Sequence, residues 1–143
     1  MKAKVSAIYR SDISTAYRQP YFEAKVPAGF PSPAADYEEN QLDLNKHLIK
    51  NPAATFFVRV SGDSMTGAGI HDGDLLVVDR SLEPKDKNVV IAAVNGELTV
   101  KRIRIRKKKV FLEAANEKYA PRQISDQTDF QVWGVVTSVI HPV

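Results

Sequence analysis

Ser64 is a residue whose type and setting could support nucleophilic chemistry. It lies in SGDSMTGAGIHDGD, residues 61–74, a glycine-rich loop between two apolar stretches. Glycines permit close backbone turns, so we expect the serine to be exposed and held by rigid neighbours. Its hydroxyl would need a base to remove the proton before it could attack a carbonyl. A plain surface turn is the alternative for this loop.

Lys101 is the candidate base, in a stretch, residues 97–106, that has the composition of a strand. Alternation with a period of two places it on one face with Thr99, Ile103 and Ile105, which we expect to point toward the core. The opposite face carries Leu98, Val100, Arg102, Arg104 and Arg106, and its arginines are expected to point outward. Burial disfavours the charged form of lysine and lowers its pKa, and a neutral lysine can take a proton from a serine. Alternatively, the lysine only begins a basic run and reaches solvent.

Other catalytic and metal chemistries find little support in the sequence. There are no cysteines and only three histidines, so we expect neither a metal nor a cofactor. His71 and Asp72 could form a Ser–His–Asp arrangement with Ser64, but they share its glycine-rich loop, and His71 is more typical of a surface turn.

Length and composition indicate one folded domain. The chain has 143 residues, 43% hydrophobic and 26% charged, which is typical of soluble globular proteins. It has neither the run of about 20 apolar residues that a spanning helix needs nor a secretory signal. We therefore expect a soluble protein of the cytoplasm.

The positive charge is concentrated in KRIRIRKKK, residues 101–109, which holds seven of the 20 basic residues and no acid. The rest of the chain has 13 basic against 17 acidic residues, so strong direct DNA binding is not expected. We interpret the lysines at 107–109 as a solvated strand end. The competing hypothesis is a non-enzymatic module that binds nucleic acid or an acidic partner through residues 101–109.

Residues 1–40 are predicted to form a flexible N-terminal arm, because four prolines interrupt any helical or strand period. Within it, VPAGFPSPAADY, residues 26–37, carries Ala28 and Gly29 between prolines that favour extended backbone. Such a segment is suited to lying as a strand in a cleft.

Residues 41–143 are predicted to form a β-rich core. The core begins with a short helix over 42–50, and Asn51-Pro52 is the predicted stop of that helix. Six stretches rich in Val, Ile, Phe and Thr are predicted strands: 53–62, 74–81, 88–94, 97–106, 109–115 and 130–140. Asn95-Gly96 between two of them is a strong hairpin signal. The fold class is therefore mainly β, a partly closed antiparallel barrel or sandwich.

The segments SGDSM, DGDLLVVD and VIAAVNGELTVKRI occur in this order and resemble the self-cleaving Ser/Lys proteins of the LexA/UmuD family. GFPSPAADY is similar to the UmuD branch in particular. The resemblance implies the carboxy-terminal fold of that family, with Ser64 as nucleophile and Lys101 as base. It also implies self-cleavage between Ala28 and Gly29. We take the backbone N–H groups of Asp63 and Ser64 as candidate oxyanion donors.

The resemblance further implies partners: a homodimer, a RecA filament on single-stranded DNA that stimulates cutting, and a UmuC-like Y-family polymerase in error-prone translesion synthesis. Residues 1–26 are too few for the helix-turn-helix domain of LexA-type repressors, so a repressor is disfavoured. A signal-peptidase-like enzyme using the same dyad is the remaining alternative. It is the least favoured one, because the sequence shows no membrane anchor of the kind such enzymes carry.

Overall fold

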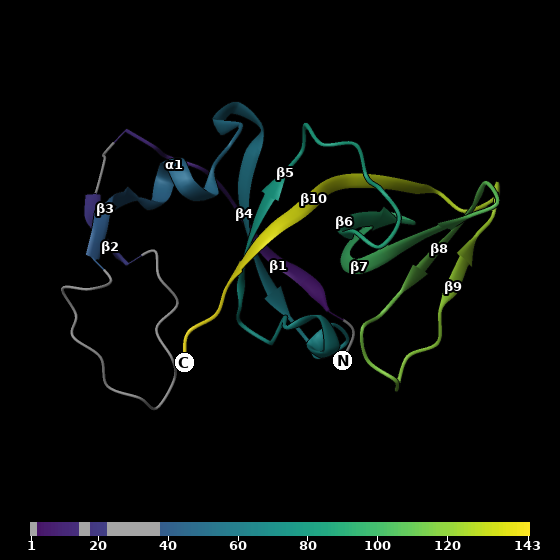
Figure 1. Ribbon diagram of the computed structural model, residues 1–143. Coiled ribbons are helices and arrows are strands. Elements are labelled where there is room, and N and C mark those ends of the chain that lie inside the picture. The colour runs from purple at the N-terminus through teal and green to yellow at the C-terminus, as the bar shows by residue number, and fades with distance from the viewer. Residues whose placement is uncertain (1–2, 15–17, 23–37) are drawn as a thin grey trace. The chain divides into compact units, whose positions relative to one another are not determined.

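The computed structural model describes residues 3–14, 18–22 and 38–143, and Figure 1 traces their strands. The chain divides into two compact units, one of Met1–Ser11 with Asn51–Val143 and the other of Asp12–Lys50. The stretch 23–37, which contains the expected cleavage site Ala28–Gly29, lies outside the described residues. Among the residues described, no helix is long and apolar enough to cross a membrane.

The larger unit is built on a closed antiparallel barrel, which confirms the predicted fold class. Its strand order is β1, β4, β5, β10, β6, β7, and a pairing of Lys4 with Thr99 joins β7 back to β1. The bounds are β1 Lys4–Arg10, β4 Thr55–Ser61, β5 Leu75–Asp79, β6 Val89–Val94, β7 Glu97–Arg106 and β10 Phe130–Ile140. Two further strands, β8 (Lys109–Glu113) and β9 (Arg122–Ile124), extend the sheet beyond β7.

All six predicted strands are present, but the barrel also contains a strand that the sequence pattern places in the arm. Lys4–Arg10 forms β1 and pairs antiparallel with β4 over most of its length. Most of its side chains are exposed, while Ala3 before it is fully buried and Val5 packs on the core. A strand that buries so few side chains has little alternation of apolar and polar residues. For this reason the sequence pattern of residues 4–10 does not predict a strand.

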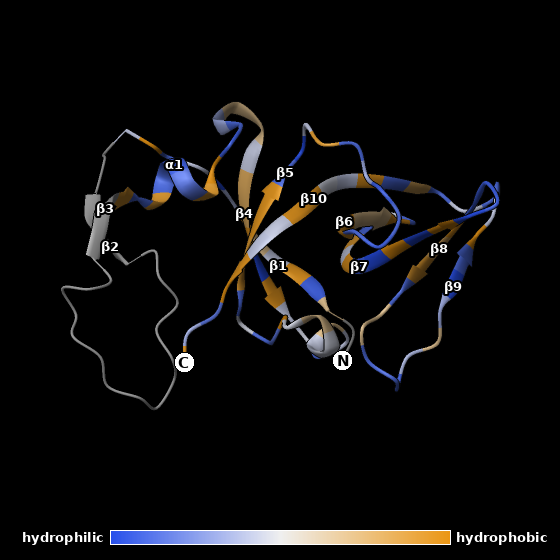
Figure 2. Ribbon diagram, in the orientation of Figure 1, coloured by the Kyte–Doolittle hydropathy of each residue, from blue (hydrophilic) through white to orange (hydrophobic). Residues whose placement is uncertain are grey.

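Two apolar clusters lie on the two faces of this sheet. One holds the fully buried Val58, Leu76, Ile91 and Val100, and the other includes Val90, Ile103 and Leu112. Each fully buried side chain of this size contributes about 1.5–3 kcal/mol. Figure 2 shows hydrophobic and hydrophilic bands alternating along β7, which lies between the clusters.

The two-face prediction for β7 is therefore only half right. Ile103 is buried as expected, at 2% exposure. Val100, on the opposite face, is fully buried in the other cluster, and Ile105 is 38% exposed. The reason is that β7 is covered on both sides around residues 100–103, whereas its far end runs out to a solvent-exposed turn.

The smaller unit contains a two-stranded sheet and the predicted helix. β2 (Arg18–Phe22) pairs with β3 (Glu38–Asp43), and α1 follows at Leu44–Leu48. The helix is shorter than the predicted 42–50 because Asp43 caps it, its carboxylate accepting from the Asn45 N–H at 3.0 Å. Ile49 is already extended, ahead of the 3₁₀ turn η2 at Pro52–Ala54.

Two hairpins of the larger unit have turns with the same backbone conformation. Asn95 and Gly96 have φ of 49° and 84°, as a type I′ turn requires. Lys107 and Lys108, between β7 and β8, have φ of 49° and 64°. The predicted solvated strand end is thus a tight turn that holds two lysines in the left-handed region of backbone conformation. Residues with a Cβ adopt that region only at an energetic cost.

Lys108→Gly is expected to stabilise the protein by about 0.5–1 kcal/mol, because glycine adopts this φ without steric cost. Thermal unfolding should show a melting temperature about 3 °C higher. Lys109→Gly is the matched control: Lys109 begins β8 in extended backbone, so glycine there should lower the melting temperature. An unchanged or lower melting temperature for Lys108→Gly would contradict the turn assignment.

Candidate active site

Ser64 follows β4 in a loop that the fold covers rather than exposes. Both Ser64 and Met65 are fully buried, so the expectation of an exposed serine is wrong. The physical reason is Ala3, which packs on the loop and donates its backbone N–H to the Ser64 Oγ at 2.7 Å. The hydroxyl oxygen of the candidate nucleophile is therefore already engaged by the chain's own amino-terminal segment.

Ala3 also joins this loop to β7. Its carbonyl accepts from the Thr99 hydroxyl at 2.7 Å and from the Val100 N–H at 3.2 Å. Thr99 and Val100 immediately precede Lys101. Through the backbone of one residue, the structure thus connects Ser64 with the part of β7 that carries the candidate base.

Lys101 lines a cavity of about 350 Å³ on the larger unit. The walls combine apolar and polar groups and include Lys4, Leu98, Thr99, Leu112 and Tyr119. Lys101 itself is partly buried. Its exposure therefore lies between the buried base and the solvent-exposed lysine that the sequence left as alternatives. A cavity with apolar walls beside a lysine is large enough to receive side chains of an extended peptide.

Asn116 and Tyr119, in the loop after β8, hold the residue just before the candidate nucleophile. The Asn116 Nδ2 donates to the Asp63 carbonyl at 2.9 Å, and the Tyr119 hydroxyl donates to the Asp63 Oδ1 at 2.8 Å. The hydrogen bond to that carboxylate raises the pKa of Tyr119. Sequence reasoning missed both residues, because they lie more than 50 positions away in a polar stretch without a motif.

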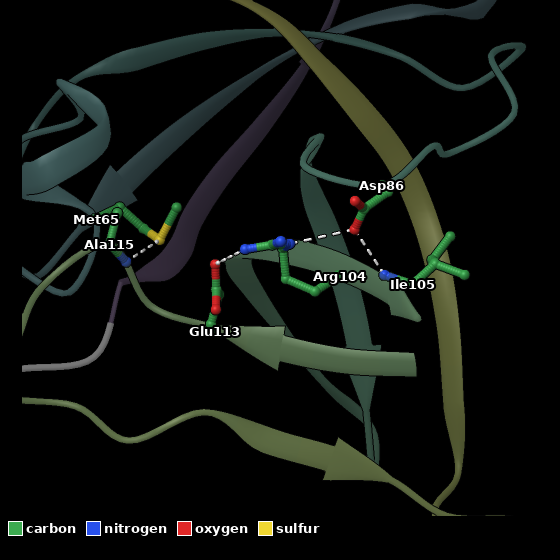
Figure 3. A network of polar contacts seen from close by, with 6 residues as sticks. All are labelled: Met65, Asp86, Arg104, Ile105, Glu113 and Ala115. Carbon is green, nitrogen blue, oxygen red and sulfur yellow. Dashed lines mark hydrogen bonds and ion pairs between the residues drawn. The ribbon is translucent and has the colours of Figure 1, made fainter. Parts of the chain in front are cut away.

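The same two loops make a second set of contacts just after Ser64, partly shown in Figure 3. The Gly67 N–H donates to the Ala115 carbonyl at 2.6 Å, and the Ala115 N–H donates to the Met65 Sδ at 3.4 Å. A Cβ at Gly67 would lie 2.5 Å from the Ala115 carbonyl oxygen. Glycine is therefore required at Gly67 for the loops to approach this closely.

His71 and Asp72, the alternative catalytic pair, have other roles in the structure. The Asp72 carboxylate accepts from the Gly62 N–H at 2.8 Å and closes the loop around Ser64. The His71 ring lies against the His141 ring, with 4.9 Å between centroids, and the backbone N–H of His71 donates to the buried Asp74 carboxylate at 2.7 Å. These contacts suit a well-tied turn, as the sequence favoured for His71.

The basic strand is partly neutralised by its neighbours. Arg104 contacts the carboxylates of Asp86 at 3.2 Å and Glu113 at 3.3 Å (Figure 3). Asp86 also accepts from the Ile105 N–H at 2.8 Å, and this hydrogen bond, with Arg104 beside it, lowers the pKa of Asp86. An arginine held by two carboxylates is poorly placed for phosphate contacts, which weakens the hypothesis of a nucleic-acid module.

Comparison with known proteins identifies relatives along nearly the whole chain. The profile of a family described as Peptidase S24-like matches residues 20–137. Protein SamA of Salmonella typhimurium strain LT2 is 50% identical over 122 residues, covering 85% of this chain and 84% of SamA. Protein MucA of Escherichia coli is 40% identical over 143 residues, covering 98% of this chain and 97% of MucA. The LexA repressor of Shewanella denitrificans is 42% identical over 100 residues, covering 70% of this chain and 48% of the repressor.

Proposed function

The chain belongs to the Peptidase S24-like family, and on that basis we propose that it is a serine peptidase that cuts itself between Ala28 and Gly29. Ser64 is the nucleophile and Lys101 the base. The observation that carries the proposal is Ala3, whose backbone bonds both the Ser64 hydroxyl and the β7 residues next to Lys101. An extended substrate peptide bound between the Ser64 loop and β7 would make main-chain hydrogen bonds of the same kind.

In the proposed reaction, neutral Lys101 takes the Ser64 proton as Oγ attacks the Ala28 carbonyl carbon. The carbonyl oxygen becomes an oxyanion, for which the N–H groups of Asp63 and Ser64 are the proposed donors. Collapse breaks the bond to Gly29, whose nitrogen receives the proton from Lys101. The again neutral lysine then takes a proton from water as the water oxygen attacks the ester carbonyl carbon. The bond to Ser64 Oγ breaks, Lys101 returns the proton to that oxygen, and the Ala28 carboxylate is released.

Regulation and partners follow from the resemblance to the UmuD branch. We propose that a RecA filament on single-stranded DNA favours the docked arm, a population shift that requires tighter binding to that state. The shortened product, as a homodimer, would join a UmuC-like polymerase in translesion synthesis in the cytoplasm of a bacterium. The similarity to SamA and MucA over most of the chain supports this assignment.

The test is to incubate the purified protein between about pH 7 and pH 10 and follow its intact mass, with and without RecA filament and nucleotide. The expected product begins at Gly29, and it should appear faster at alkaline pH because the base must be neutral. A wild-type protein that stays uncut with the filament present would contradict the proposal.

Gly29→Trp is expected to slow cutting at least about tenfold, because the peptide after the scissile bond must pass close to the loop and strand backbones. The same mass assay measures this rate. Phe30→Trp, one residue further on, is the matched control and should cut at close to the normal rate. Equal rates for both variants and the wild type would place the cut elsewhere.

A further inference from the structure

The loop after β8 holds the peptide bond that joins Asp63 to Ser64. Asn116 donates to the carbonyl oxygen of this peptide at 2.9 Å. A peptide bond is planar and trans, so its carbonyl and its N–H point in opposite directions. Fixing the Asp63 carbonyl therefore also fixes the direction of the Ser64 N–H, which then points away from Asn116.

The orientation of Asn116 is itself determined by a second hydrogen bond. Its Oδ1 accepts from the Lys118 N–H at 3.0 Å, so the amide oxygen faces its own loop and the Nδ2 faces Asp63. The Thr66 hydroxyl lies 3.5 Å from the same Nδ2. Tyr119 holds the side chain of Asp63 at 2.8 Å, so the residue is held at both its peptide and its carboxylate.

We propose that Asn116 is a positioning residue for self-cleavage, because it orients the Ser64 N–H toward the oxyanion that forms on the scissile carbonyl. The proposal rests on the proposed function. Catalysis by such a donor depends on the N–H being aimed before the charge develops, since a donor that must reorient loses part of its benefit. Tyr119 supports the same residue more weakly, through its side chain rather than its peptide.

Two variants remove the Asn116 donor in different ways. Asn116→Leu keeps the size and adds no charge, while Asn116→Asp keeps an acceptor for the Lys118 N–H. Each is expected to lower the rate of self-cleavage about tenfold, less than the direct loss of an oxyanion donor. Glu117→Ala, an exposed neighbour in the same loop, is the matched control and should cut at the wild-type rate.

The pH profile separates positioning from a loosened fold. For Asn116→Leu, the cleavage rate should fall by the same factor at every pH, because Lys101 is unchanged, and the melting temperature should stay close to that of the wild type. A rate equal to the wild type in both variants would overturn the proposal. So would a slow rate with a lowered melting temperature and a shifted profile.

Tyr119→Phe provides the test if the Asn116 variants do not fold. It removes only the hydroxyl that holds the Asp63 carboxylate and should slow cutting two- to fivefold. This rate change corresponds to an activation free energy raised by about 0.4–1 kcal/mol. An unchanged rate would overturn the role of this loop. An uncut wild type would instead reject the proposed function, and the inference with it.

Discussion

Ser64→Ala is expected to abolish self-cleavage, lowering its rate at least about 10³-fold, because it removes the hydroxyl that the proposed mechanism uses to form the ester with Ala28. The fold should survive with a modest loss of stability. Ser64 Oγ accepts the N–H of the buried Ala3 at 2.7 Å, and losing an acceptor for a buried donor costs about 1–3 kcal/mol. Intact mass after alkaline incubation measures the cut, and thermal unfolding measures the stability.

Lys101→Ala should abolish cutting to the same extent, for a different reason. The serine would remain but no amine would take its proton, so the acceleration at alkaline pH should disappear with the rate. Ser6→Ala is a suitable control, because its hydroxyl donates to the Arg59 carbonyl on the exposed side of β1. Product beginning at Gly29 from either dyad variant would contradict the assigned chemistry.

Most of the barrel could be predicted from the sequence, because its strands bury apolar side chains that show up as Val- and Ile-rich runs. Val58, Leu76 and Ile91 are fully buried members of three such runs. β1 and β9 are different: β9 spans only Arg122–Ile124 and β1 is largely exposed, so backbone pairing rather than side-chain burial defines them. Pairing between distant segments leaves no local pattern to detect.

The sequence proposes residue types for the candidate site, but it does not predict what surrounds them in the fold. A glycine-rich loop and a lysine on an apolar strand indicate nucleophile and base, and these features are local. Ser64 is covered by Ala3, which lies 61 positions away in the sequence. The preceding residue, Asp63, is held by Asn116, which lies 53 positions away. Both contacts are long-range hydrogen bonds to backbone, which sequence composition does not record.

The contact between Ala3 and Ser64 leads to a further large effect, in the opposite direction. Ala3 lies beside Ser64 and β7: its N–H donates to the Ser64 Oγ, and its carbonyl accepts from the Thr99 hydroxyl and the Val100 N–H. The proposed reaction requires the Ala28 carbonyl to reach the same Ser64 Oγ, so we expect Ala3 to obstruct it. In the proposed reaction, the docked arm and residue 3 would therefore compete for the space beside the Ser64 hydroxyl. A covered nucleophile reduces the reactive fraction, and the observed rate falls by that fraction.

Ala3→Pro should accelerate spontaneous alkaline cleavage up to about 100-fold, because proline has no N–H to give Ser64 and the covered state loses its advantage. Ala3→Trp should act in the same direction, since Ala3 is fully buried and a large ring cannot fit there. Tyr9→Ser, at an exposed position on β1, the strand that follows Ala3, should leave the rate unchanged. Slower cutting by both Ala3 variants would mean that residue 3 helps to assemble the site instead of covering it.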